Sequence, residues 1–115
     1  MPPFSRGDVV LARLDPKGGA EKFGTRPCVI VQNDRANSNP SWPITIVVPI
    51  TGRDARYPFD VSVASPEGGL DRDSSVDCSQ VHTIDKKKIL HLLGSFSPET
   101  MAKIEEATKI TLDLP

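Results

Sequence analysis

Residues 28–50 read CVIVQNDRANSNPSWPITIVVPI, and this stretch decides the fold class. Its two ends, residues 28–32 and 44–50, are short, apolar and rich in β-branched side chains, so they predict two buried strands. Residues 33–43 between them hold three Asn, two Ser and two Pro, a composition typical of a loop. Pro49 cannot donate a hydrogen bond to a neighbouring strand, so its end of the second strand is expected at a sheet edge or a bulge.

The same pattern extends outward in both directions. Further short strands are predicted at residues 8–14, 59–63, 75–81 and 89–96, with Gly- and Pro-containing turns between them. Asp85 is expected to cap a short helix through residues 86–88. After Ser97 and Pro98, an N-cap and a first helical residue, the apolar spacing becomes helical. The pattern therefore predicts a mainly β fold, a small barrel with a C-terminal amphipathic helix.

Length and composition narrow the class of protein. The 115 residues are 37% hydrophobic and 25% charged, which predicts one globular domain over residues 1–115. No apolar run approaches the roughly 18 residues that a membrane span needs, and no signal region is evident, so we expect a cytoplasmic protein. Cys28 and Cys78 lack the spacing of a zinc site or a disulfide framework and are expected to be small buried hydrophobic residues.

Blocks of residues along almost the whole chain resemble the MazF/PemK toxin family. They stand in the family's order and spacing and are Arg6–Val9, Gly24–Asp34, Pro49–Thr51, Asp73–Val76, Gln80–Lys86 and Gly94–Thr100. The resemblance implies an SH3-like barrel and a two-fold homodimer. It further implies the toxin of a type II toxin–antitoxin system, an endoribonuclease that cuts single-stranded RNA at short sequences, with no metal and no cofactor. The expected partner is a MazE-like antitoxin whose acidic disordered segment competes with RNA.

The chemistry implied by this family needs three polar groups. The ribose 2′-hydroxyl attacks the neighbouring phosphate, and the products are 2′,3′-cyclic phosphate and 5′-hydroxyl ends. Arg26 matches the family's catalytic arginine and can hold two phosphate oxygens, although a surface salt bridge is an alternative role. Thr51 matches the catalytic threonine, or else stabilises the turn before Gly52. Glu21 is the carboxylate best placed in sequence to take the 2′-proton, or else a solvated loop acid.

The candidate RNA-binding residues share either a cationic side chain for phosphates or a polar side chain for base edges. They are Lys22, Gln32, Asn33, Arg53, Arg56, Gln80 and His82. Trp42 offers a surface on which a base could stack, or packs against the barrel rim. Ala20, Lys22 and His82 depart from the residues common in the family, which bears on the recognition sequence more than on the chemistry.

Other functions remain open at this stage. A CcdB-like toxin shares the barrel and poisons gyrase by binding it without nuclease activity, but such a binder does not need Arg26 and Thr51. An SH3-like domain for Pro-rich ligands would want an aromatic groove, and only 5% of residues are aromatic. A ribonuclease with two catalytic histidines would have to use His82 and His91, and the latter is expected to be structural.

Overall fold

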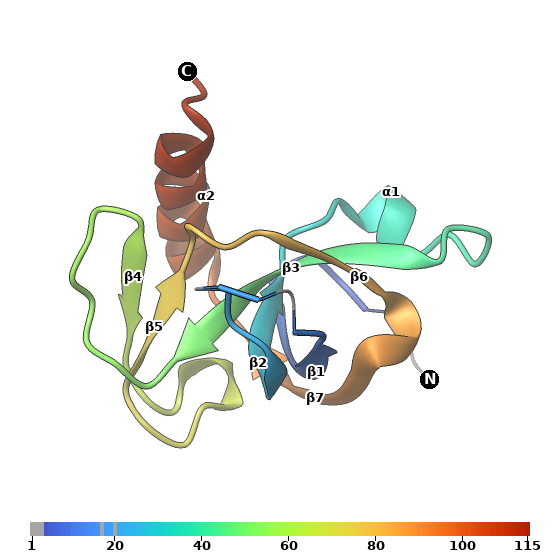
Figure 1. Ribbon diagram of the computed structural model, residues 1–115, viewed down its shortest axis with the longest axis horizontal. Helices are drawn as coiled ribbons and strands as arrows, with labels where there is room; N and C mark the ends of the chain where they lie inside the picture. Colours follow the sequence, from blue (N-terminus) through green and yellow to red (C-terminus); the bar gives the residue numbers. More distant parts are fainter. Residues whose placement is uncertain (1–3, 17, 20) are drawn as a thin grey trace.

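The computed structural model describes residues 4–16, 18–19 and 21–115. The strands and helices of this part are shown in Figure 1. In chain order they are β1 (Asp8–Leu14), β2 (Gly24–Ile30), α1 (Asp34–Asn37), β3 (Ile44–Thr51), β4 (Asp60–Val63), η1 (Glu67–Gly69), β5 (Ser74–Asp77), β6 (His82–Asp85), η2 (Lys86–Lys88), β7 (Ile89–Ser95) and α2 (Pro98–Leu112).

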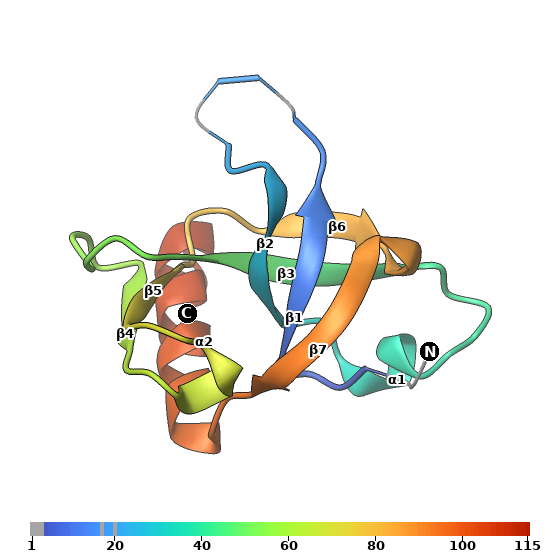
Figure 2. The ribbon, with the colours of Figure 1, turned by 90° about the horizontal axis from the view of Figure 1, so that it is seen from below.

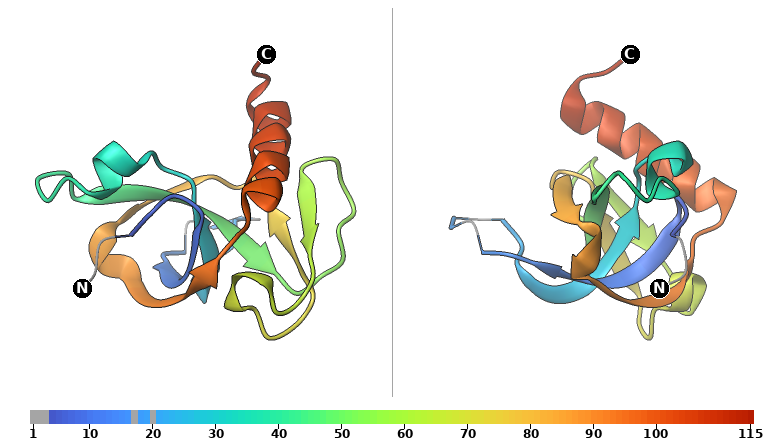
Figure 3. Two further views of the ribbon diagram at one scale, coloured as in Figure 1. Left: turned by 180° about the vertical axis from the view of Figure 1, so that it is seen from behind. Right: turned by 90° about the vertical axis from the view of Figure 1, so that its right-hand side faces the viewer.

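All strand pairings are antiparallel, and the sheet runs β4-β5-β3-β2-β1-β7 with β6 also paired to β3. The strands curve into a barrel-like sheet that does not close completely (Figure 2). Helix α2 lies along one side of this sheet, beside β4 and β5, and its C-terminal end extends beyond it (Figure 3). The prediction of a mainly β barrel with a C-terminal helix is confirmed.

Two strands occupy the same edge of β3, one after the other. Ile50 pairs with Val76 of β5, whereas Val47 pairs with His82 of β6, so the register shifts between the two pairs. Pro49 lies between them on β3 and pairs with neither strand in these registers, which agrees with its lack of an N–H donor. The single strand predicted at residues 75–81 was wrong in extent, because residues 78–81 leave the ladder at this shift.

Alternate residues of the central strands face two separate cores. Val9, Val29 and Val48 pack with β4, β5 and helix α2, where Ile104 is completely buried. The second core lies inside the curved sheet and includes Cys28, which is 0% exposed. Burying a side chain such as Ile104 contributes roughly 1.5–3 kcal/mol. The two cores therefore hold the two faces of β2 and β3 in fixed positions.

The local capping predictions are confirmed. The Ser97 hydroxyl accepts from the Thr100 N–H at 3.1 Å at the start of α2, and Asp85 caps η2 by accepting from the Lys87 N–H at 2.8 Å. Helix α1 was not predicted, because a four-residue helix has no readable apolar period. The ammonium of Lys86 holds it in place by donating to backbone oxygens of Ala36, Asn37 and Asn39, each at 3.1 Å.

Both cysteines are free and completely buried, as expected from the sequence. Burial raises the pKa of the Cys28 thiol to about 12 and that of Cys78 to about 11. Neither thiol is therefore ionised at neutral pH. No helix in the described part of the chain has the length and apolar character to cross a membrane. No cluster of metal-binding side chains is found among those residues.

Candidate active site

Arg26 and Thr51 belong to the neighbouring antiparallel strands β2 and β3. Cys28 and Pro49 form the last pair of this ladder on the side of Arg26 and Thr51. Arg26 stands two residues before Cys28 and Thr51 two residues after Pro49, so alternation places both side chains on the face of the Cys28–Pro49 pair. Thr51 in turn pairs with Ser75 of β5, which extends this face to a third strand.

Arg26 carries an uncompensated positive charge. Its Nε atom is buried and has no hydrogen-bond partner among the described residues, and no described carboxylate forms an ion pair with it. Its charge acts on the neighbouring Cys28 thiol, where it opposes the larger effect of burial on the pKa. A buried guanidinium donor without an acceptor is unfavourable in the free protein and is suited to an anion from outside.

Thr51 is the last residue of β3. The side chain is half-buried, and Oγ1 accepts a long hydrogen bond of 3.5 Å from the Arg53 N–H. Ser75 opposite is completely buried, and its hydroxyl donates to the Arg53 backbone oxygen at 3.0 Å. The β3 end is thus tied to β5 through Arg53, while the Thr51 hydroxyl keeps its own proton available for a bound group.

A cluster around Asp77 lies on the same face as Ser75. Asp77 is 2% exposed, and its Oδ2 atom accepts from Lys22 Nζ at 2.8 Å and lies 3.7 Å from Arg53 Nη2. Gln80 approaches the same oxygen through Nε2 at 3.4 Å. The Asp77 carboxylate therefore contacts three separate segments: the one before β2 through Lys22, the one after β3 through Arg53, and residues 78–81 after β5 through Gln80.

Two carboxylates in and beside this cluster are held ionised. Burial raises the pKa of Asp77, but hydrogen bonds from Lys22 and Ser79 and the Lys22 charge outweigh burial, so the pKa lies below its usual value. Asp60 behaves alike: burial opposes ionisation, and Arg53 together with two backbone N–H groups lowers the pKa. Arg53 binds Asp60 through both Nη atoms, at 2.8 and 3.1 Å. Arg53 is therefore already paired in the free protein.

Glu21 lies at the margin of the cluster. Its side chain is exposed, and the next residue, Lys22, is fixed by its own N–H, which donates to Gln80 Oε1 at 2.7 Å. Gln80 therefore reaches both the backbone of this segment and Asp77. Ala20, which was singled out from the sequence, lies outside the described part.

The remaining predicted residues are arranged less favourably for RNA. Gln32 is 6% exposed, with Nε2 donating to Asn37 Oδ1 at 2.9 Å and Oε1 accepting from Trp42 Nε1 at 3.4 Å. Asn33 accepts from the Ala36 N–H at 2.9 Å as the N-cap of α1. Contact of Gln32 with RNA requires its present hydrogen bonds to open, whereas Asn33 is exposed and uses only its Oδ1 atom in the cap. Trp42 itself is 45% exposed.

His82 is the first residue of β6, and Arg56 lies in the segment between β3 and β4. His82 is 5% exposed but lines a pocket of about 180 Å³ together with Arg13 and Lys88. Arg56 is exposed, and its backbone N–H donates to Asp60 at 2.9 Å. Both positions are compatible with ligand contact at the edges of the site, away from the Arg26–Thr51 pair.

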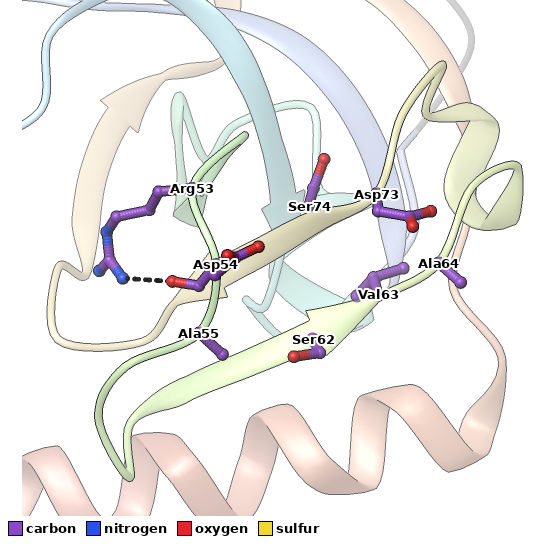
Figure 4. A pocket seen from close by; sticks show the side chains of 8 residues that line it. All are labelled: Arg53, Asp54, Ala55, Ser62, Val63, Ala64, Asp73 and Ser74. Atoms are coloured by element: carbon purple, nitrogen blue, oxygen red, sulfur yellow. Dashed lines mark hydrogen bonds between the residues drawn. The ribbon is translucent and has the colours of Figure 1, made fainter.

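A larger pocket, of about 340 Å³, lies on the β4–β5 hairpin (Figure 4). Asp54 and Asp73 contribute carboxylates to its lining, and Arg53 is its one cation. Because the Arg53 guanidinium is bound to Asp60, this pocket has a local excess of negative charge. It is therefore a poor site for phosphate, and the Arg26 face is the better one.

Sequence reasoning missed Asp77, Asp60 and Ser75. Asp77 and Lys22 are separated by 55 residues, so no local pattern connects them. A cue for Asp77 was its place in a predicted strand between Val76 and Cys78, because an acidic residue on a buried face requires a cationic partner.

Residues 5–112 match the family model described as PemK-like, MazF-like toxin of type II toxin-antitoxin system. An endoribonuclease from a Mycobacterial species is 25% identical with a TM-score of 0.81, covering 100% of this chain and 96% of that one. An endoribonuclease solved with its cognate antitoxin, also Mycobacterial, is 26% identical with a TM-score of 0.78, covering 96% of each chain. MazF from Deinococcus radiodurans has a TM-score of 0.84 at 19% identity, covering 99% and 100%, and shares the fold.

Proposed function

The chain belongs to the PemK-like, MazF-like toxin family of type II toxin–antitoxin systems, and from this premise we propose that it is a metal-independent endoribonuclease that cuts single-stranded RNA at short recognition sequences. The observation that carries the proposal is Arg26, a partly buried cation whose Nε atom has no hydrogen-bond partner in the described residues, on the strand next to the one that ends at Thr51. A phosphodiester supplies the anion that this arginine lacks. The similar endoribonucleases support the same reaction class.

The proposed reaction uses the groups at the ends of β2 and β3. Arg26 binds the non-bridging oxygens of the scissile phosphate, and its charge stabilises the transition state. The Thr51 hydroxyl donates a hydrogen bond to the same phosphate. Glu21 takes the proton of the 2′-hydroxyl, whose oxygen bonds to phosphorus while the bond to the 5′-oxygen breaks and that oxygen is protonated. The products are a 2′,3′-cyclic phosphate and a 5′-hydroxyl.

The RNA strand is proposed to run from this centre across the cluster and its borders. Lys22, Arg53 and Arg56 supply positive charge for flanking phosphates. Gln80 keeps its Oε1 atom on the Lys22 N–H and supplies Nε2, whose bond to Asp77 is long at 3.4 Å, for a base edge. His82 contributes from its pocket beside β6. Gln32 stays in the proposal only as a residue that places Trp42, because its side chain is engaged internally. Asn33 caps α1 through Oδ1, and its exposed amide N–H groups are proposed to donate to a base edge.

The proposed protein partners are a second copy of the chain and an antitoxin. Leu90, Leu92 and Leu93 are 44%, 55% and 36% exposed on β7, at one end of the sheet. An exposed leucine-rich strand of this kind is a surface that a partner copy can cover. A MazE-like antitoxin with an acidic disordered segment would compete with RNA for Arg26 and the cations near it. Solved MazE–MazF complexes support such a partnership. We place this reaction in the cytoplasm.

The test is cleavage of a long single-stranded RNA in excess EDTA by the wild-type protein, Arg26→Ala and Arg35→Ala. Arg35 is the matched control, because it is an exposed arginine on α1 whose guanidinium forms no ion pair within the described residues. We expect recurrent cuts with cyclic phosphate ends from the wild-type and Arg35→Ala proteins and almost none from Arg26→Ala. Absence of cutting by folded, dimeric, antitoxin-free wild-type protein would replace this proposal with a CcdB-like gyrase binder.

A further inference from the structure

Asp77 is the most highly engaged carboxylate near the proposed centre. It is 2% exposed, and its Oδ2 atom serves two cations from different parts of the chain: Lys22 at 2.8 Å and Arg53 at 3.7 Å. Its Oδ1 atom accepts from both the N–H and the hydroxyl of Ser79, at 3.1 and 2.5 Å. The hydrogen bonds from Ser79 thus fix the carboxylate at the end of β5, and its Oδ2 atom faces the two cations.

Each of these two cations lies close in the chain to a residue of the proposed reaction. Lys22 follows Glu21 directly, and the Lys22 N–H is held by Gln80 at 2.7 Å. Arg53 is two residues beyond Thr51, and its N–H donates to the Thr51 hydroxyl oxygen. Asp77 therefore links the segment that carries the general base to the strand end that carries the phosphate-binding hydroxyl.

We propose that Asp77 is a positioning residue for the endoribonuclease reaction proposed above, on which this inference rests. Through Lys22 and Arg53 it positions Glu21 relative to Thr51. It also limits the binding of these two cations to RNA phosphates other than the intended ones. Asp77 does not touch the RNA. Its first effect is geometric, because a base works only within hydrogen-bond reach of the proton it takes. Its second effect is electrostatic, because a cation paired with a buried carboxylate contributes less to phosphate binding than an unpaired one.

The two effects predict opposite changes in kcat and in RNA affinity. Asp77→Asn keeps the shape and the acceptor for Ser79 but removes the charge that holds both cations. We expect kcat to fall at least tenfold while KM and Kd decrease. The plot of log Kd against log salt should steepen by about 0.7 for each additional phosphate that a released cation neutralises on a single strand. A general loss of structure would instead weaken binding.

The experiment compares Asp77→Asn with Asp54→Asn in single-turnover cleavage and in RNA binding across a salt series. Asp54 is the matched control, because it is an exposed acid next to Arg53 whose carboxylate forms no ion pair within the described residues. It makes the same change in net charge. We expect Asp54→Asn to keep the wild-type kcat. Equal kcat values for Asp77→Asn and wild type, or equal effects of the two variants, would overturn the proposal.

Lys22 provides an independent pair of variants should Asp77→Asn fold poorly. Lys22→Arg keeps the cation and should keep most of kcat, whereas Lys22→Met should lose at least tenfold, and its combination with Asp77→Asn should lose less than the two single losses multiplied together. Additive losses in the double variant would contradict action through Lys22.

Hydrogen exchange at the Lys22 amide separates failure of this inference from failure of the proposed function. The amide is bonded to Gln80 and should exchange slowly in wild type and faster in Asp77→Asn. If wild type cuts no RNA, the endoribonuclease is refuted, and this exchange alone decides whether Asp77 holds the segment. Unchanged exchange in Asp77→Asn would refute that holding role, whatever the activity.

Discussion

Arg26→Ala should abolish most of the activity without destabilising the protein. Two charge-assisted hydrogen bonds to the phosphate are lost, at roughly 1.5–3 kcal/mol each. Their sum, about 3–6 kcal/mol, corresponds to a fall of about 10² to 10⁴ in the cleavage rate. Arg26→Lys keeps the charge but not the planar pair of donors, so it should lose about half of that free energy and fall roughly 10- to 100-fold.

Arg26→Ala is not expected to lower the free energy of unfolding, because Nε of Arg26 has no acceptor among the described residues. Removing a buried donor without a partner relieves about 1–3 kcal/mol, which offsets the lost packing of the aliphatic stem. The free energy of unfolding should therefore stay the same or rise. Arg53→Ala is the contrasting variant: it leaves the buried Asp60 carboxylate unpaired and should lower the free energy of unfolding by about 1–3 kcal/mol.

The assay is single-turnover cleavage in EDTA, with urea unfolding of each variant measured in the same buffer. The informative result is the separation of the two readouts for Arg26, with activity lost and stability kept. If Arg26→Ala lowers both in proportion, Arg26 is a structural residue and the proposed role is wrong. A similar separation for Arg53→Ala would show that internal pairing does not distinguish the two arginines.

Three further predictions concern neighbouring groups. Thr51→Ser should keep cleavage within a few-fold while Thr51→Val loses roughly 10²-fold in rate, because only the hydroxyl is used; the same cleavage assay measures both. Lys86→Met should lower the free energy of unfolding in urea by about 1–2 kcal/mol with little change in cleavage rate, because three backbone oxygens at 3.1 Å lose their donor. The pKa values of Asp60 and Asp77 are lowered on folding, so their stabilisation is complete above the unfolded pKa of about 4 and is lost as the pH falls through the folded values; thermal unfolding between pH 7 and pH 2 should show this loss, and Asp77→Asn should flatten it.

The part of the fold that local chemistry controls could be predicted from the sequence. Helix α2 begins after Ser97 as its cap and Pro98 predicted, and β1 has the predicted bounds. The interruption at residues 78–81 could not be predicted, because it arises from the register of β5 and β6 against β3. The local sequence pattern carries no information about that register. The family resemblance pointed to Arg26 and Thr51 as site residues, and the fold places them on the neighbouring strands β2 and β3.

The same distinction applies to the polar residues. Gln32 at a strand end reads as exposed, yet the following loop folds back and buries it under Trp42. Conversely, Asp77 reads as one acid among 15 acidic residues, and only the fold brings Lys22 to it from 55 residues away. Long-range ion pairs of this kind leave no periodic signal, because the pairing depends on which loops the sheet brings together.

The cations near the proposed centre differ in whether a carboxylate of the protein pairs with them, and this difference bears on function. Lys22 and Arg53 each have a carboxylate close by, whereas Arg26 has none among the described residues. Because Lys22 and Arg53 are paired with carboxylates, they attract phosphate less strongly, and Arg26 is left as the cation that lacks an anionic partner. A phosphodiester bound at Arg26 supplies the hydrogen-bond acceptor that the described residues do not, and in the proposed reaction the Thr51 hydroxyl donates to the same phosphate. Selective neutralisation of the neighbours therefore favours placing the scissile phosphate, rather than any other phosphate of the strand, at Arg26.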